Sequence, residues 1–380
     1  RRSMQTKADN QAEIERVIEI FHRKKPICYT LKEIRQEESD SRWVLFVSFA
    51  KERFVIKIAA NGFTTQQRVE GWNTLIAAYT EMGYYSPKLL KSLTGHFSER
   101  ITFQNKQCVV WEEEFCPYHL QNSLDERLYR NADGSYSYQN DVFAFVGKVA
   151  QKHFDNFPYP SGWVRFEPYG SDEICDEVTD CVHTFDRLVR TKAPRFIPRW
   201  ESILGLFREN SARLQKIYHN LPTSVFQADA CGGNLVLDEN GRFMGVIDYN
   251  LAGKDTALNM FLSMILFEYS RHRKQAQDPG VLPGLNKETQ DSVIAIMLQI
   301  LRDIKKYYRF HELEAAAAPL LYKYIDTVTY EAIDTLETYA DEEEKLHLLF
   351  DFMEYQLTND TIDFKAAMLG ENGPGRDFPV

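Results

Sequence analysis

The sequence lacks the features that identify small stapled domains and membrane proteins. Its six cysteines include no Cys-x-x-Cys pair, so neither a zinc finger nor a disulfide framework is expected, and we interpret the cysteines as reduced thiols. No apolar run approaches the roughly 20 residues that span a bilayer, and no secretory segment opens the chain. We therefore expect a soluble, cytoplasmic protein with no membrane partner.

The sequence also lacks an excess of basic residues. It carries 45 Lys and Arg residues against 55 Asp and Glu residues, which gives a formal net charge of −10. Nucleic-acid binding relies on a basic face that contacts phosphates, so we expect no nucleic-acid partner. A chain of 380 residues, 44% of them hydrophobic, is long and apolar enough to form two lobes, each with its own core.

Residues 1–116 combine strand-like and helical patterns. Apolar residues at helical spacing predict one helix that ends before Pro26 and another over 64–82. Runs rich in β-branched and aromatic residues predict four strands, at about 43–49, 53–59, 100–104 and 107–115. We interpret this part as an N-terminal nucleotide-binding lobe built on a small antiparallel sheet, with a helix inserted after the first hairpin.

Residues 117–380 are mainly helical in pattern, with one short β interruption. We therefore predict an α+β, bilobal architecture, in which an antiparallel-sheet lobe is followed by a mainly helical catalytic and substrate-binding lobe. The boundary is expected near residue 116.

The β interruption, residues 226–250, predicts a tight hairpin. Two strand-like runs flank Asn240-Gly241, which is a strong turn signal. Asn234 begins the first run and Asp248 ends the second, so both residues should lie at the same end of the hairpin.

A third polar residue, Asp229, lies in the loop that leads into this hairpin, and two adjacent glycines let that loop fold over its end. One amide and two carboxylates then converge, and such hard oxygen ligands suit Mg²⁺, while an aspartate can also deprotonate a hydroxyl. The alternative interpretation is that all three are ordinary loop residues that cap turns.

A lysine in an apolar strand, Lys57, favours the catalytic interpretation. It could extend to solvent at a sheet edge, or it could bind the phosphates of a nucleotide while paired with a helical carboxylate, for which Glu70 is the candidate. Protein kinases use a strand Lys, a helix Glu, a catalytic-loop Asp, an Asn and a metal-binding Asp. All five occur here in that order, and the last three are Asp229, Asn234 and Asp248.

In these motifs the sequence resembles the aminoglycoside/choline phosphotransferase family, small-molecule kinases that share the protein-kinase-like fold. Typical members carry H-G-D-x-H-x-x-N followed by a strand that ends I-D-F or I-D-W; here these read QADACGGN (227–234) and IDY (247–249). Weaker similarities to family segments cover most of the chain: "GYYSPKLL", "VAQKHFDNF" and "GKDTALNMF".

The resemblance implies an enzyme that moves the γ-phosphate of ATP or GTP to a hydroxyl of a small molecule. Asp229 would be the catalytic base, and Asn234 and Asp248 would hold Mg²⁺. Lys57 would bind phosphates, with Glu70 anchoring it. The adenine would lie against a hinge around Glu114 to Cys116.

The sequence departs from the family pattern at three supporting positions. Gln227 and Cys231 stand where members usually have His, and Asn259 replaces an Asp. Gln and Asn can still donate and accept hydrogen bonds. The loop "SFAKERF" between the first two predicted strands has no glycine-rich cover for phosphates. The alternative function is therefore a catalytically weak or inactive kinase-like protein that binds nucleotide or serves as a scaffold.

The phosphate acceptor stays open among aminoglycoside, choline, homoserine and sugar classes. Four acidic residues fall on one side of a predicted helix: Glu331, Asp334, Glu337 and Asp341. Such a row could bind a polycationic substrate, but a solvated outer helix face is the favoured interpretation.

Overall fold

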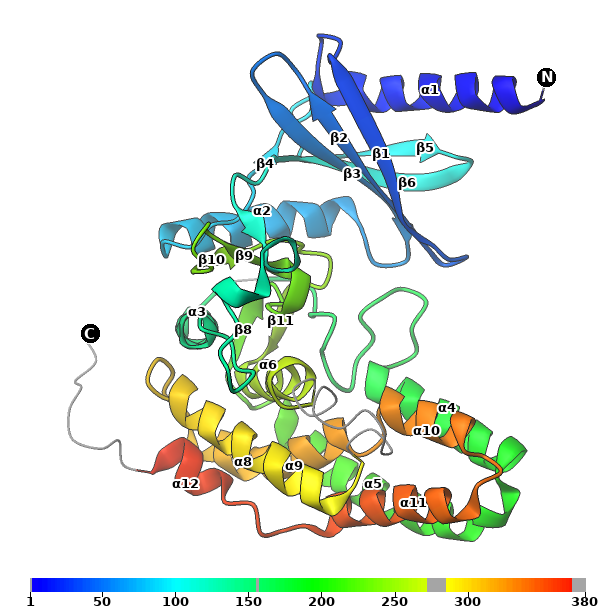
Figure 1. Cartoon of the computed structure of the whole chain (residues 1–380), viewed down its shortest axis with the longest axis vertical. Coiled ribbons are helices and arrows are strands. Elements are labelled where there is room, and N and C mark those ends of the chain that lie inside the picture. The colour runs from blue at the N-terminus through cyan, green and yellow to red at the C-terminus, as the bar shows by residue number, and fades with distance from the viewer. Residues whose placement is uncertain (1, 155–156, 272–284, 371–380) are drawn as a thin grey trace.

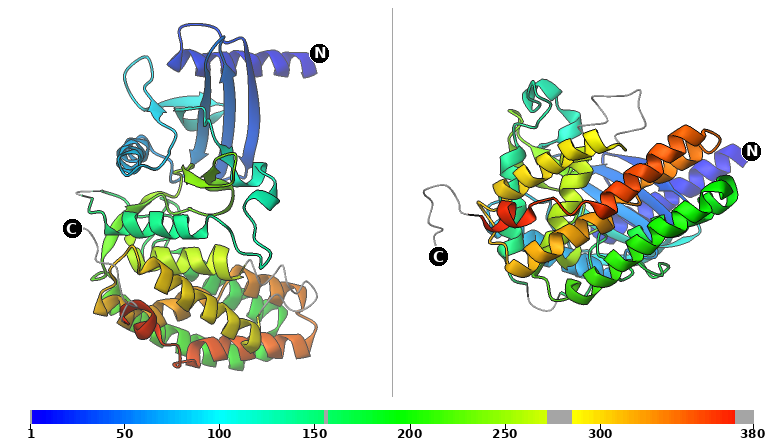
Figure 2. Two further views of the ribbon diagram at one scale, coloured as in Figure 1. Left: turned by 60° about the vertical axis from the view of Figure 1, so that its left-hand side comes forward. Right: turned by 90° about the horizontal axis from the view of Figure 1, so that it is seen from below.

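The computed structural model describes residues 2–154, 157–271 and 285–370, which form two lobes (Figure 1). A sheet lobe lies above a mainly helical lobe, and the left-hand view of Figure 2 shows the same division. The predicted α+β, bilobal architecture is confirmed. The proposed boundary at residue 116 stays a prediction; in the structure the last strand of the large sheet ends at Glu114.

The N-terminal sheet is antiparallel, with strand order β1-β2-β3-β6-β4 and with β5 paired to β6. One of its faces buries helix α1 through Ile14, Val17, Ile18 and Phe21. The elements of this lobe are α1 (Arg2–Phe21), β1 (Cys28–Gln36), β2 (Asp40–Ser48), β3 (Arg53–Asn61), α2 (Gln66–Glu81), β4 (Leu89–Leu90), β5 (Ser98–Phe103) and β6 (Lys106–Glu114).

Strand β1 was not predicted from the sequence, and its environment explains why. It lies at the edge of the sheet, pairs only with β2 in the described sheet, and has mostly exposed side chains. An edge strand that buries little apolar surface has no clear alternation of apolar and polar residues. The first two strands of the sheet are therefore β1 and β2, and "SFAKERF" spans the end of β2, the turn to β3 and the start of β3.

Helix α2 forms where the sequence predicts it. Thr65 caps its first turn by accepting a hydrogen bond from the backbone N–H of Arg68. Its buried stripe packs against the sheet, where Trp72 and Trp111 meet edge to face with ring centroids 5.2 Å apart. Tyr79, near its C-terminal end, hydrogen-bonds through its hydroxyl to the chain at Gln227 in the other lobe, at 3.0 Å. The helix thus touches the loop that contains Asp229.

The C-terminal lobe packs helices around two short antiparallel sheets (Figures 1 and 2). Its strands are β7 (His119–Leu120), β8 (Thr223–Phe226), β9 (Leu235–Leu237), β10 (Phe243–Val246) and β11 (Gly253–Thr256). Its helices are α3 (Gln139–Gln151), α4 (Glu177–Lys192), α5 (Ile197–Tyr218), α6 (Ala257–Met264), the π-helix η5 (Ile265–Arg271), α8 (Lys287–Ile304), α9 (Glu312–Asp326), α10 (Tyr330–Thr338), α11 (Glu343–Thr358) and α12 (Phe364–Leu369). Short 3-10 turns are η1 (Gln121–Ser123), η2 (Glu126–Leu128), η3 (Pro194–Phe196) and η4 (Gly232–Asn234). Within the described residues, no helix combines the length and apolar character needed to cross a bilayer.

The two lobes are joined by a backbone contact at Gly245 on β10. The Tyr85 N–H donates to the Met244 carbonyl at 2.8 Å, and the Val246 N–H donates to the Tyr85 carbonyl at 3.1 Å. A Cβ built on Gly245 would overlap the backbone of Tyr85. Only a glycine lets the segment after α2 approach β10 this closely.

We predict that Gly245→Ala lowers the free energy of unfolding by about 1–3 kcal/mol, because the backbone contact must open to admit the methyl group. The matched control is Gly205→Ala on the exposed face of α5, where an added Cβ has no neighbour within 4 Å. That substitution should instead raise the free energy of unfolding by about 0.5–1 kcal/mol. Urea unfolding of both variants checks this; equal effects would contradict the close approach.

Candidate active site

The loop between β8 and β9 holds Asp229 at the centre of a small hydrogen-bond network. The Asn234 amide donates to one Asp229 carboxylate oxygen at 2.5 Å, and the Cys231 thiol donates to the other at 3.0 Å. Gly232, with φ +52°, provides the turn that brings Asn234 back onto Asp229. The predicted convergence of Asp229 and Asn234 is therefore present.

The hairpin of β9 and β10 brings Asp248 to the same place. Leu235 pairs with Val246, and the next backbone N–H, that of Ile247, donates to the Asn234 carbonyl at 3.0 Å. Asp248 thus follows directly after a residue bonded to Asn234, as the hairpin pattern predicted.

The pKa of Asp229 also indicates that Asp248 lies close to it. Burial raises the pKa of Asp229 to about 6, and the negative charge of Asp248 contributes to the rise. Hydrogen bonds from Cys231 and Asn234 to the carboxylate act in the opposite direction. The site therefore contains a carboxyl group that titrates near neutral pH beside a second acidic residue, an arrangement typical of catalytic centres.

Two residues of this region adopt a left-handed backbone conformation that costs non-glycine residues free energy. Ala228 has φ +67° and Asp248 has φ +63°. Such strain costs on the order of 1–3 kcal/mol for each residue and persists only where surrounding contacts fix it.

Gln227, which is buried, supplies those contacts. Its side-chain oxygen accepts from the Asp229 N–H at 2.8 Å. Its side-chain nitrogen donates to the carbonyls of Ile247 and Asp248 at 2.7 and 2.6 Å. One amide thus spans both strained turns, and it does so at a position where the family it resembles usually has His.

Asn259, which stands where the family usually has Asp, also makes several hydrogen bonds. It is fully buried on α6, and its amide nitrogen donates to the Trp163 carbonyl at 2.7 Å and to Asp255 at 2.9 Å. Its oxygen accepts from Arg165 Nε at 3.0 Å. Both departures from the family pattern are therefore compatible with an ordered loop, because Gln and Asn supply donors and acceptors at these positions.

The predicted partner of Lys57 is wrong. Its ammonium lies 3.1 Å from Glu113 on the neighbouring strand β6, whereas Glu70 is exposed on α2. The reason is helical phase: Val69 and Trp72 face inward, and this rotates Glu70 toward solvent. The alternation of side chains along β6 could have identified Glu113 as the partner. Trp111 pairs with Lys57 across the strands, and Glu113, two residues further along β6, lies on the same face of the sheet.

Lys57 interacts electrostatically with Asp248, the acidic residue beside Asp229. Burial would lower the pKa of its ammonium, but the carboxylates of Glu113 and Asp248 outweigh burial, and the net shift is upward. A lysine that stays charged between an N-lobe carboxylate and a C-lobe carboxylate connects the two lobes electrostatically at the site.

Arg42 is a second cation on this face and was not predicted. Val44 pairs with Lys57 and Arg42 pairs with Ala59 two residues away, so the two cations lie on the same face of the sheet. Arg42 donates twice to Asp40, at 2.8 and 2.7 Å. Arg42 thus adds a second cationic side chain near the start of β2, on the sheet face that carries Lys57.

Cavities extend from this centre into the C-terminal lobe. One of about 350 Å³ has Asp229 in its wall, together with Trp163, Phe267, Tyr330 and Glu331. The predicted acidic row reaches this cavity only through Glu331: Asp341 lies beyond the end of α10, and the exposed Glu337 is 3.5 Å from Lys192. The row is thus mostly a solvated face.

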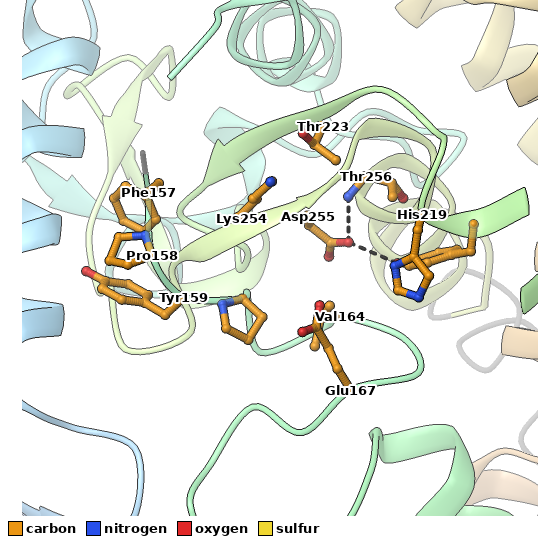
Figure 3. A pocket seen from close by; sticks show the side chains of 12 residues that line it. Phe157, Pro158, Tyr159, Val164, Glu167, His219, Thr223, Lys254, Asp255 and Thr256 are labelled. Carbon is orange, nitrogen blue, oxygen red and sulfur yellow. Dashed lines mark hydrogen bonds between the residues drawn. The ribbon is translucent and has the colours of Figure 1, made fainter. Parts of the chain in front are cut away.

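A separate cavity of about 280 Å³ is lined by Asp255, Lys254 and His219 (Figure 3). The Asp255 carboxylate accepts from the Tyr218 hydroxyl at 3.1 Å and from the Thr256 N–H at 2.7 Å, and the second of these hydrogen bonds joins two labelled residues in the figure. It also accepts from Ser161 and Asn259. These four donors satisfy the Asp255 carboxylate, so we interpret Asp255 as a structural residue that connects β11 to the segments around it.

The donor set fits Mg²⁺. Asn234 and Asp248 offer hard oxygen atoms, and the mutual repulsion of Asp229 and Asp248 would be relieved by a divalent cation. Within the described residues, no group of three or more His, Cys, Asp and Glu side chains is arranged to hold a metal.

The predicted adenine contacts at Glu114 and Cys116 stay a prediction. Glu114 ends β6, and its N–H donates to the Lys88 carbonyl at 3.0 Å. The Cys116 thiol lies 3.7 Å from the Tyr118 carbonyl. All six cysteines are free, as expected of reduced thiols.

No family model matches the chain, and no curated protein matches it. Solved structures with similar folds include a microcompartment-associated aminopropanol kinase, with 11% identity over 90% of this chain and 94% of that one, at a TM-score of 0.45. An amicoumacin kinase in complex with AMP-PNP and Ca²⁺ has 14% identity over 96% and 98%, at a TM-score of 0.48. An aminoglycoside phosphotransferase in complex with gentamicin has 13% identity over 94% and 97%, at a TM-score of 0.43. These structures are small-molecule kinases and aminoglycoside phosphotransferases, but at such identities and TM-scores the function of this chain has to be inferred from its own site.

Proposed function

We propose that the protein is a Mg²⁺-dependent phosphotransferase that moves the γ-phosphoryl group of ATP or GTP to a hydroxyl of a small molecule. The observation that carries the proposal is the convergence of Asp229, Asn234 and Asp248, with Lys57 close enough to Asp248 to interact with its charge and with two of the contributing turns held in strained conformations. Asp229 also lines a cavity large enough for a small acceptor.

Asp229 is the group that orients the acceptor hydroxyl and receives its proton. The oxygen of that hydroxyl bonds to the γ-phosphorus, the bond from the γ-phosphorus to the bridging oxygen breaks, and the nucleoside diphosphate leaves. The pKa of about 6 suits this role, because the carboxyl group is ionised at neutral pH yet remains basic enough to accept a proton.

Lys57 and Arg42 bind phosphates from the N-terminal lobe, with Glu113 in place of Glu70 as the residue that orients Lys57. Asn234 and Asp248 hold the metal, which when bound offsets negative charge on the phosphates. The cations and the metal ligands thus approach the phosphates from opposite lobes.

The alternative of an inactive scaffold is less well supported. A scaffold has no need to hold Ala228 and Asp248 in costly conformations or to keep Asp229 buried beside a like charge. Gln227 and Asn259, the departures that suggested a relaxed loop, both make short hydrogen bonds to the loop and its supports.

We predict that Mg²⁺ with ATP or GTP raises the melting temperature of the wild-type protein and that Asp248→Ala loses the Mg²⁺-dependent part of this rise. A ligand at about 100 times its Kd should stabilise the native state by about 2.7 kcal/mol. Differential scanning fluorimetry with nucleotide alone and with nucleotide plus Mg²⁺ measures both parts.

Two carboxamide variants serve as a matched pair in the same assay. Glu70→Gln changes an exposed side chain and should keep the wild-type shift, whereas Glu113→Gln removes the partner of Lys57 and should reduce the shift. Absence of any shift in the wild-type protein at millimolar nucleotide would refute the proposed function.

We predict that Asp229→Asn has opposite effects on rate and on stability. Loss of the base should lower single-turnover phosphoryl transfer by about 10²–10⁴-fold. The folded-state pKa of Asp229 lies above its unfolded value, so stability is lost as pH rises toward about 6 and the full penalty is present above that pH. The variant should therefore gain on the order of 1–2 kcal/mol of unfolding free energy at pH 7.5 and little near pH 4.

Urea unfolding at the two pH values and quench-flow kinetics check the two halves of this prediction. Asp334→Asn, on the exposed face of α10, is the control for removal of one negative charge. In the wild-type enzyme, kcat/KM should fall as pH decreases below about 6, because Asp229 becomes protonated. A variant with normal turnover would show that Asp229 is not the base.

A further inference from the structure

We infer that Arg68 and Tyr169 are positioning residues that couple helix α2 to the orientation of Asp248, the proposed metal ligand. This inference rests on the proposed function and specifies how one ligand of its metal is held. It is carried by a continuous series of contacts, which begins at Arg68 on α2, passes through Tyr169 in the C-terminal lobe and ends at the Asp248 carboxylate.

Helix α2 does not reach the site through an ion pair with Lys57. In protein kinases, a Lys on the sheet and a Glu on the following helix must pair for activity, and this ties the position of the helix to catalysis. Here Lys57 pairs with Glu113, and Glu70 is exposed. Arg68 lies two residues before Glu70 and faces inward, with 8% of its surface exposed. It is therefore the buried charged residue of α2.

Arg68 is held by two tyrosines of the C-terminal lobe. Its Nη2 donates to the Tyr169 carbonyl at 2.5 Å. Its Cζ lies 4.2 Å from the centroid of the Tyr169 ring and 5.3 Å from the centroid of the Tyr159 ring. Cation–π attraction is largest where the cation is shielded from water, and a planar guanidinium can stack on a ring while it donates a directed hydrogen bond. These contacts fix Arg68 and Tyr169 relative to each other.

The backbone of α2 is docked on the same segment, which lies between α3 and α4. The Tyr159 hydroxyl donates to the Arg68 carbonyl at 2.7 Å, and a Cβ built on Gly71 would lie 1.7 Å from that hydroxyl oxygen. A glycine in a helix interior lowers helix stability, and here it admits the tyrosine. Before the helix, the Ser171 N–H donates to the Gly62 carbonyl at 3.1 Å. The first half of α2 is therefore fixed against this segment.

Tyr169 also contacts the chain just after Asp248. Its hydroxyl donates to the Asn250 carbonyl, and the Asn250 N–H donates to the Asp248 carboxylate at 3.1 Å. The pKa of the Tyr169 hydroxyl is raised, mainly by burial, and the charge of Asp248 contributes to the rise. The carboxylate of the proposed metal ligand is thus oriented by the backbone N–H of a residue that Tyr169 holds in place.

These contacts bear on metal binding in particular. Gln227 holds the Asp248 backbone through its carbonyl, whereas Asn250 donates to the Asp248 side chain. Groups that orient a metal-ligating carboxylate affect metal affinity, and their loss typically lowers that affinity about 10–100-fold. When Tyr169 no longer holds Asn250, the protein should therefore keep its fold and bind Mg²⁺ more weakly.

The contribution of Mg²⁺ to nucleotide binding measures this effect. Differential scanning fluorimetry gives the apparent Kd of ATP or GTP with Mg²⁺ and with EDTA, and the ratio of the second value to the first reports the stabilisation by the metal. We expect this ratio to be about 10-fold lower in Tyr169→Phe and in Arg68→Met than in the wild-type protein. The double variant should be no lower than either single variant, because both residues act through one series of contacts.

Tyr308→Phe is the matched control, because it removes another buried tyrosine hydroxyl that donates to a neighbour. The Tyr308 hydroxyl donates to Glu314 at 3.0 Å in the core of the helical lobe. Its removal should lower the melting temperature in the absence of ligand, as Tyr169→Phe should, and leave the ratio of apparent Kd values unchanged.

The outcomes distinguish this inference from the proposed function. If the wild-type ratio exceeds one and Tyr169→Phe keeps it, the positioning role is wrong and the proposed function stands. An equal fall in Tyr308→Phe would show a general loss of stability and would also overturn the inference. An unchanged ratio in Arg68→Met would overturn the coupling to α2. A wild-type protein that binds nucleotide equally with and without Mg²⁺, or not at all, would instead refute the proposed function.

Discussion

The active-site region depends on one buried side-chain amide, that of Gln227. Its oxygen fixes the N–H of Asp229 and its nitrogen fixes the carbonyls on either side of the bond between Ile247 and Asp248. These three hydrogen bonds are shared between the two left-handed turns at Ala228 and Asp248, and they fix the backbone of Asp229 relative to that of Asp248. A buried amide whose donors and acceptors are satisfied is rigid, because leaving any of them unpaired costs free energy.

Neighbouring side chains connect the segments held by the Gln227 amide to the N-terminal lobe. Tyr79 connects α2 to the backbone of Gln227, while Ser86 hydrogen-bonds Tyr249, the residue after Asp248. The position of the N-terminal lobe is thus coupled to the loop that contains Asp229. Lys57 adds an electrostatic link, because its charge is stabilised by Glu113 from one lobe and by Asp248 from the other. The proposed phosphate-binding lysine and the proposed metal ligand Asp248 are therefore positioned relative to one another by contacts within the protein.

The sequence predicted the local parts of this site and missed the parts that depend on tertiary structure. Asp229, Asn234 and Asp248 could be placed together because a short hairpin converts sequence spacing into proximity. Lys57 was assigned to Glu70 because spacing along the chain cannot give the rotation of a helix against a sheet. Strand β1 has too little buried surface to leave a pattern, so the turn beside Arg42 was also missed.

The cavity that Asp229 lines could be predicted from the sequence even less well. Trp163, Glu177, Phe267 and Tyr330 come from separate segments of the C-terminal lobe, and each alone is an ordinary aromatic or acidic residue in the sequence. The helical core brings them to one side of Asp229, so their shared chemistry exists only in three dimensions. In the proposed reaction the two substrates would therefore be bound in different ways. Phosphate binding would rest on a compact hairpin region in which Gln227 stands where the family usually has His, whereas acceptor binding would depend on residues distributed over the fold.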